Sequence, residues 1–200
     1  MAINLANNNS LANITALPSS ISGGAMTLLA TQTASGSANL SFTSGIDSTY
    51  DSYVFKFYNI HPATDGVTFE FQGSTNGGST YGVTITSSVF QAYHQENDAG
   101  AGIQYATNND LAQSTSFQKI TGDLGNQNDE CGSGIVQLFN PSSTTFVKHF
   151  ITRENGQQNN EQSVNVFAAG YFNTTSAINA VQFKMSSGNF DGVIKLYGVS

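Results

Sequence analysis

The chain has 200 residues, of which 38% are hydrophobic and 10% are charged, and its formal net charge is −7 at pH 7. Its six Lys and Arg residues are scattered along the sequence. Nucleic acid and anionic membrane surfaces both require a clustered basic face, so we expect neither as a partner. The single cysteine, Cys131, can form neither an intrachain disulfide nor a zinc framework. We therefore expect one domain with one hydrophobic core and a polar, mostly neutral surface.

Residues 1–25 differ in composition from the rest of the chain. Aliphatic side chains are spaced through a neutral polar background, at Leu5, Leu11, Ile14 and Leu17. This spacing does not sustain a helical stripe, and so polar a segment cannot bury much of itself. We therefore predict an N-terminal arm over 1–25 that stays loose alone or orders by laying these side chains on a partner. The folded domain is predicted over 26–200.

The sequence carries no sign of a targeting or membrane segment. The first positively charged side chain is Lys56, so the charged start of a secretory signal peptide is missing. No apolar run approaches the ~18–20 residues of a membrane span. We expect no signal peptide and no membrane insertion.

From residue 26 onward, short alternating apolar stretches are separated by turn residues, which is typical of strands. The strands are expected at 26–34, 37–42, 50–60, 67–71, 81–89, 135–139, 146–152, 164–172, 177–185 and 193–199. Ser35-Gly36 indicates a two-residue hairpin, and Asn155-Gly156 indicates a turn that opens a polar loop to Gln162. Residues 91–129 are expected to form long loops with two weak strands and room for a short helix near 110–113.

This spacing of turns predicts an all-β fold, an antiparallel two-sheet sandwich that is jelly-roll-like. Bulky residues at alternating positions are expected to fill its core. The core candidates are Phe55, Phe57, Phe69, Phe71, Phe139, Phe150, Phe167, Phe183 and Leu196.

The sequence contains only weak catalytic or metal-binding patterns. His94 is followed by Glu96 and Asp98, which is compatible with a metal ligand or a base but is typical of any polar loop. The densest oxygen cluster could supply calcium ligands, although a solvated loop is the favoured interpretation; it comprises Asp123, Asn126, Asn128, Asp129 and Glu130. Nucleophile-elbow, zinc-protease and phosphate-loop motifs are all missing. We expect a protein that is not an enzyme and holds no cofactor.

Tyrosines near predicted loops suggest one further kind of site. Exposed aromatic rings beside Asn and Asp are typical of sugar-binding surfaces, and the possible glycan platform comprises Tyr50, Tyr81, Tyr93 and Tyr105. The alternative is that each ring packs against the core with only its hydroxyl in water.

Long stretches of the folded part carry a family resemblance. They are TLLATQTAS (27–35), SFTSGIDSTYDSYVFKF (41–57), NIHPATDGVTFEFQ (59–72), LFNPSSTTFVKHF (138–150), AGYFNTTSAINAVQFKMSSGN (169–189) and GVIKLYGV (192–199). These stretches resemble small virion structural proteins of tailed bacteriophages, especially those of marine and cyanobacterial hosts. The resemblance implies a component of the virion, assembled in the host cytoplasm, and supplies no catalytic residues.

An arm followed by a compact β-domain suits a capsid decoration or cement protein that docks on the major capsid lattice through its arm. By analogy of architecture, such a protein is expected to be a homo-oligomer, with a trimer the favoured form. The expected partners are therefore other virion proteins, either the major capsid protein or a tail component. The alternative is a tail-fibre or adhesin domain that binds a glycan of the host surface.

Overall fold

The computed structural model describes residues 26–200, and all regular structure in this part is β. The strands are β1 (Thr27–Ser37), β2 (Asn39–Phe42), β3 (Ser52–Pro62), β4 (Phe69–Ser74), β5 (Ile85–Gln95), β6 (Ala101–Tyr105), β7 (Gln118–Lys119), β8 (Gly132–Phe139), β9 (Lys148–Gln158), β10 (Gln162–Phe172), β11 (Ala180–Met185) and β12 (Phe190–Val199). The all-β prediction is confirmed. The short helix expected near 110–113 is wrong, because this segment is an irregular loop whose backbone pairs with β5.

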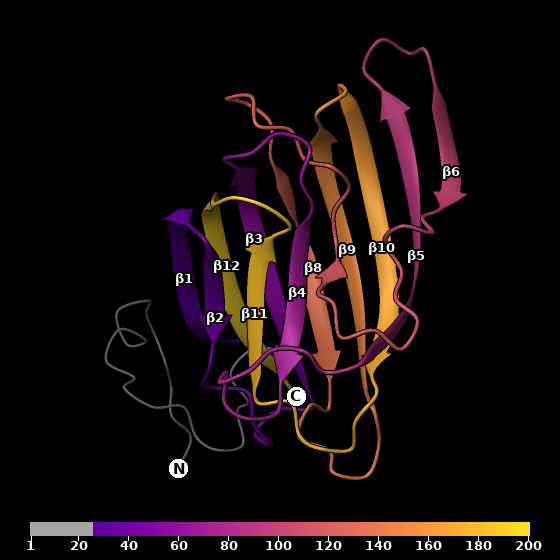
Figure 1. Cartoon of the computed structure of the whole chain (residues 1–200). Coiled ribbons are helices and arrows are strands. Elements are labelled where there is room, and N and C mark those ends of the chain that lie inside the picture. Colours follow the sequence, from indigo (N-terminus) through magenta and orange to yellow (C-terminus); the bar gives the residue numbers. More distant parts are fainter. Residues whose placement is uncertain (1–25) are drawn as a thin grey trace, which may run out of the picture.

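The strands form two antiparallel sheets that face each other as a sandwich (Figure 1). The large sheet has the order β1-β12-β3-β8-β9-β10-β5-β6, and the small sheet has the order β2-β11-β4-β7. The first four strands of the large sheet and the four of the small sheet have the strand order of a jelly roll. The prediction of a jelly-roll-like sandwich is therefore confirmed.

The other four strands of the large sheet extend it beyond the jelly roll, and we call them the extension (β9, β10, β5 and β6). Strands β5 and β6 come from the connection between β4 and β7, and β9 and β10 come from the connection between β8 and β11. In Figure 1 these strands reach past the edge of the small sheet. The small sheet therefore covers only part of the inner face of the extension.

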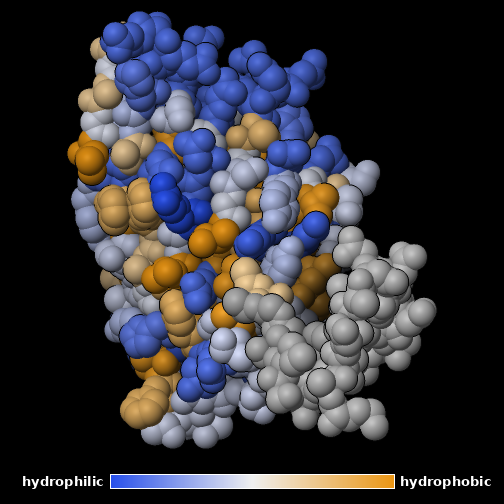
Figure 2. Space-filling view, turned by 180° about the vertical axis from the view of Figure 1, so that it is seen from behind, coloured by the Kyte–Doolittle hydropathy of each residue, from blue (hydrophilic) through white to orange (hydrophobic). Residues whose placement is uncertain are grey.

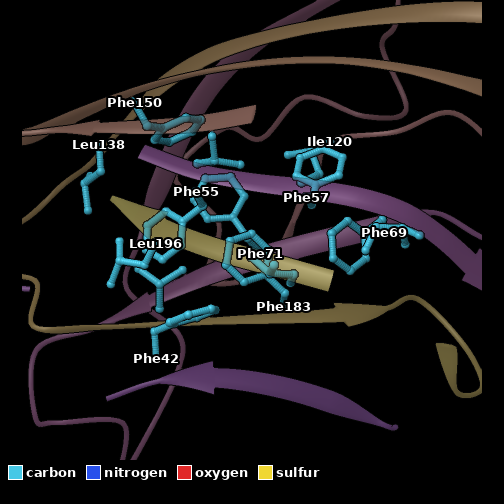
Figure 3. Close-up of a cluster of buried hydrophobic side chains, with 14 of the residues drawn as sticks. Phe42, Phe55, Phe57, Phe69, Phe71, Ile120, Leu138, Phe150, Phe183 and Leu196 are labelled. Carbon is cyan, nitrogen blue, oxygen red and sulfur yellow. The ribbon is translucent and has the colours of Figure 1, made fainter. Parts of the chain in front are cut away.

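Phenylalanine rings fill the space between the two sheets (Figure 3). Phe183 of β11 lies among four of them, with ring centroids 5.2–6.2 Å away, at Phe42, Phe55, Phe69 and Phe71. All five rings are at most 2% exposed. Burial of so much aromatic surface is the main source of stability in this domain.

Two of the predicted core residues instead lie on the outer face of the large sheet. Phe139 is 37% exposed, and its neighbour Leu138 points into the core. Phe167 also points outward, because the smaller Ala168 takes the inward position on β10. The prediction was wrong at these positions because both alternating faces of β8 and β10 carry apolar residues. The larger side chain is not always the buried one.

Two predicted turns are also corrected. Ser35-Gly36 does not close a hairpin, because it lies within β1, at a bulge in the pairing with β12 where Gly36 has a φ of 56°. The chain crosses to β2 of the small sheet at Ala38. Asn155-Gly156 lies within β9, where Gly156 pairs with Val164 of β10. The tight turn lies at Asn159–Glu161 instead, closed by the Glu161 amide donating to the Gln158 carbonyl at 3.0 Å.

Candidate functional site: the outer face of the large sheet

The face of the large sheet that points away from the small sheet carries exposed aromatic and aliphatic side chains. Because side chains alternate along a strand, the residues beside Ala168 and Val89 on the inner face point outward. Exposed hydrophobic residues on the outer side of the extension include Phe90 (48%), Ile151 (44%) and Ile103 (78%). Figure 2 views this face and shows apolar residues gathered over its middle.

A shallow apolar hollow lies where β8, β9, β10 and β5 run side by side. Its walls include Phe90 and Phe167, whose rings stack with centroids 4.8 Å apart and an interplanar angle of 5°. The Arg153 guanidinium lies over the Phe167 ring at 5.2 Å. The hollow has a volume of about 370 Å³ and continues past Ile151 into a second hollow beside His149. Contiguous exposed apolar surface of this kind marks interaction sites in soluble proteins.

The same face carries positive charge on β3 and β12. Lys56 and Lys195 are direct cross-strand partners, and such a pair of like charges is unfavourable. Each ammonium lies near a tyrosine ring, Lys56 over Tyr197 at 5.3 Å and Lys195 over Tyr58 at 5.7 Å. Burial, together with the neighbouring Tyr197, raises the pKa of Tyr58, so this hydroxyl stays neutral. The two lysines therefore remain uncompensated positive charges.

Acidic side chains are segregated away from this face. Among the strands of the large sheet, the described residues include only two carboxylates, Glu154 on the inner face and Asp191 near the start of β12. The loops at the end of the sandwich where β3 ends and β4 begins hold exposed carboxylates at Asp65, Glu96, Asp98, Asp123, Asp129 and Glu161, and Asp191 lies beside them in β12. The described loops at this end contain no Lys or Arg. The molecule thus has one acidic end and one apolar, cationic sheet face.

Two ionisable side chains are buried beneath the large sheet. Lys148 donates through Nζ to the carbonyls of Phe146 and Thr174 at 2.9 and 3.0 Å, and burial lowers its pKa. Glu154 is 1% exposed, neither of its carboxyl oxygens has a partner among the described residues, and desolvation raises its pKa well above the usual value.

The structure separates most of the predicted metal ligands. His94 Nε2 lies 3.0 Å from Asp98 Oδ1, but Glu96 accepts a hydrogen bond from Gln157 instead. In the loop cluster Glu130 is buried, whereas the other four members are exposed: Asp123, Asn126, Asn128 and Asp129. Among residues 26–200, no group of three or more His, Cys, Asp or Glu side chains is arranged to hold a metal ion.

The four tyrosines of the predicted glycan platform do not share one surface. Tyr50 packs edge-on against Tyr53 at the core, and Tyr81 lies in the connection between β4 and β5. Tyr93 and Tyr105 are offset by three residues in the register of β5 and β6, so they belong to opposite faces of this ribbon. Leu5, Leu11, Ile14 and Leu17 lie outside the described residues.

Sequence reasoning did not identify the outer apolar face. The signal was present in stretches where both alternating positions are apolar, such as Val166–Ala169 on β10. Alternation with a period of two assigns the apolar residues of a strand to one buried face. A strand that is apolar on both faces does not fit this rule.

Comparison with known proteins gives no match at the level of family models, curated sequences or solved structures. The resemblance to bacteriophage structural proteins therefore stays a prediction. No helix in the described part of the chain is long and apolar enough to cross a membrane.

Proposed function

We propose that the protein is a structural component of a bacteriophage virion, and specifically a decoration or cement protein that docks on the major capsid lattice. The observation that carries this proposal is the outer face of the large sheet, where stacked aromatic rings and positive charges are exposed together. A face of this kind is costly to leave in water and suits a permanent contact. The resemblance to virion structural proteins of tailed bacteriophages is the basis for proposing a virion component.

Charge indicates what the docking partner looks like. The outer face bears Lys56, Lys195 and Arg153, with no carboxylate except Asp191 near the start of a strand. It therefore fits a surface that combines apolar side chains with Asp or Glu. The acidic end of the sandwich lies at the strand ends, to one side of this contact.

The same charges restrict how copies of the chain assemble. Two copies placed outer face to outer face would bring like charges together around a two-fold axis, which is unfavourable. A cyclic trimer uses two different surfaces at each contact and avoids this problem. The proposed homo-oligomer therefore forms through other surfaces and leaves the outer face for the lattice.

The N-terminal arm is the second docking element of the proposal. Removal of residues 1–25 is expected to leave a folded domain that binds the particle more weakly than the full chain. Full-affinity binding of the truncated protein to expanded capsids would show that the arm does not contribute.

The outer face is tested by measuring how purified protein binds gene-deleted particles. These are particles of the parent phage that are assembled after the gene for this protein has been deleted. The double variant Phe90→Ser/Phe167→Ser is expected to bind roughly tenfold or more weakly, because buried aromatic anchors dominate interfaces. The matched control is Phe146→Ser, which removes a 71% exposed phenylalanine from the loop between β8 and β9. Wild-type binding by a correctly folded double variant would overturn the proposed docking face.

The alternative is a tail-fibre or adhesin domain. The four separated tyrosines do not support the glycan platform that the sequence suggested for it. A polar cleft on the inner side of the extension is the part of the structure that is relevant to carbohydrate binding.

A further inference from the structure

A polar cleft lies on the inner side of the extension, on the opposite side of the sheet from the outer face. The cross-strand partners Gln91 of β5 and Gln104 of β6 line it, together with Gln158 from the end of β9. Loop residues 106–109, Lys119 and Asp123 complete its walls. Its volume of about 440 Å³ is within the ~300–1,000 Å³ that is usual for small-ligand sites.

The wall of this cleft is fixed by hydrogen bonds from buried or half-buried groups. The fully buried Gln118 donates through Nε2 to the carbonyls of Asn109 and Lys119, each at 2.8 Å. The Lys119 ammonium donates to the Asn108 carbonyl at 3.2 Å, and the Ala106 amide donates to the Val89 carbonyl at 2.9 Å. The loop 106–109 is therefore held over the sheet, so the cleft is a preformed feature and not a gap under a loose loop.

Three amide side chains in the cleft have hydrogen-bonding capacity to spare. None of the hydrogen bonds within the described part of the chain engages the side chains of Gln91, Gln104 or Gln158. Each primary amide offers two donors and an acceptor oxygen. Together they place several donors and acceptors on the wall of one cleft.

The composition of the cleft restricts its ligand by chemistry. An anion is disfavoured by Asp123 and by the net charge of −7, and the one ammonium, on Lys119, already has a carbonyl partner. A metal cation is less well matched, because Asp123 is the only carboxylate among the described residues that line the cleft. An apolar ligand would leave the amides unpaired, which is costly. Hydroxyl groups both donate and accept, so a neutral polyhydroxylated ligand fits the site.

We propose that this cleft binds a neutral saccharide unit, with Gln91, Gln104 and Gln158 making its principal hydrogen bonds. Tyr105 follows Gln104 at the rim, and its hydroxyl donates to Asp110 Oδ2 at 2.7 Å, which ties the end of β6 to the loop beside the cleft. The site is separate from the proposed docking face and is independent of where the protein is located on the particle. A decoration protein with such a cleft would present it beside its acidic end.

The test is a nuclear magnetic resonance titration of the full-length protein that follows the side-chain amide signals of the three glutamines. The probes are glucose, galactose, mannose and N-acetylglucosamine, each raised to concentrations on the order of 10 mM so that a millimolar Kd is detected. Sodium phosphate and calcium chloride serve as the anionic and cationic comparison probes. At least one sugar is expected to shift these amide signals, and neither salt is expected to do so.

The variant Gln91→Ala/Gln104→Ala should weaken the response to that sugar at least about tenfold, the loss expected when hydrogen-bonding partners are removed from a polar site. The matched control Gln137→Ala, on the outer face of β8, should leave the response unchanged. The proposal is overturned if no sugar shifts the signals, if the shifts survive the double variant, or if phosphate or calcium shifts them equally. The double variant should bind gene-deleted particles as tightly as the wild type does. Loss of the sugar response can therefore be distinguished from failure of the docking proposal.

Discussion

The two parts of the large sheet share one alternating pattern but are covered differently. Under the small sheet, the inner face of β3 and β12 is packed with phenylalanine rings that are almost fully buried. In the extension, Phe150 and Phe172 still pack against Phe71 of the small sheet, but the inner cluster beyond them comprises only small or aliphatic residues, namely Val89, Val164, Val166 and Ala168. The large rings Phe90 and Phe167 lie on the outer side instead. The jelly roll thus supplies the stability, and the extension supplies surface for interaction.

This difference has a physical origin. Loops cover the inner face of the extension, and loops bring backbone polar groups that need partners and leave little room for large rings. Beyond Phe150 and Phe172, large aromatic side chains on this inner face would have no opposing sheet to pack against. On the outer side the same rings remain available to another molecule.

The largest expected effect contrasts a ring from each part. Phe183→Ala should lower the free energy of unfolding by about 3–5 kcal/mol, because it leaves a cavity among four rings between the sheets. Phe90→Ala should change the free energy of unfolding by about 1 kcal/mol or less, since this ring is 48% exposed. Urea denaturation of both variants measures the difference. Similar losses in the two variants would mean that the outer face is part of the core.

A second prediction concerns glycines where β8 and β9 pack closely. A Cβ at Gly134 would collide with the Arg153 carbonyl oxygen and lie 2.7 Å from the Phe57 ring. Gly134→Ala should therefore cost about 1–3 kcal/mol of unfolding free energy. The control is Gly100→Ala in the β5–β6 connection, where the nearest atom is 3.4 Å away and a change within about 0.5 kcal/mol is expected. Equal denaturation midpoints would contradict the close approach at Gly134.

The buried carboxyl of Glu154 predicts a pH dependence of stability. Desolvation raises its pKa in the folded state above the ordinary value of 4.5 that applies when the chain unfolds. Between these two pKa values the folded state binds the extra proton, so the free energy of unfolding should fall as the pH rises above 4.5 and level off above the folded-state pKa. Glu154→Gln should remove this contribution. Denaturant unfolding from pH 4 to 9 measures it.

The control for this prediction is Glu161→Gln, which changes an exposed carboxylate in the turn between β9 and β10. It should retain the decline of the wild type. If Glu154→Gln and wild type show the same pH profile, the Glu154 carboxyl is not held neutral by burial.

The smallest stability effect is expected at the paired lysines of the outer face. Lys56→Gln relieves a direct cross-strand repulsion with Lys195, so unfolding free energy should rise by a few tenths of a kcal/mol, within about 0.5 kcal/mol. Binding to gene-deleted particles should nevertheless become weaker and less sensitive to salt. Unchanged salt dependence would show that the charge of this face does not contact the partner.

Much of the fold was predictable because local patterns report local structure. The strand around Phe55 and Phe57 and the one around Phe183 were located because apolar residues alternate there over several positions. The exchange of strands between sheets was not predictable, since Gly36 permits the same positive φ in a bulge within a strand as in a hairpin. Sequence alone does not specify which sheet receives the next strand.

The candidate sites were less predictable than the fold. Alternation distinguishes two faces of β10 but does not say that Phe167 is the outward residue, because that depends on what covers the strand. The glutamines of the cleft are separated by 13 to 67 positions in the sequence, and none carries a motif. Tyrosines were chosen for their chemistry, yet the register of β5 and β6 separates Tyr93 from Tyr105.

In the proposed function, the outer face of the large sheet binds another virion protein. A density map of the intact phage particle, into which residues 26–200 are fitted, tests it most directly. We expect the stacked rings of Phe90 and Phe167 to lie against a neighbouring capsid protein, with the small sheet facing away from it. Density that places this face in solvent, or that has no copy of the domain on the capsid, would contradict the account.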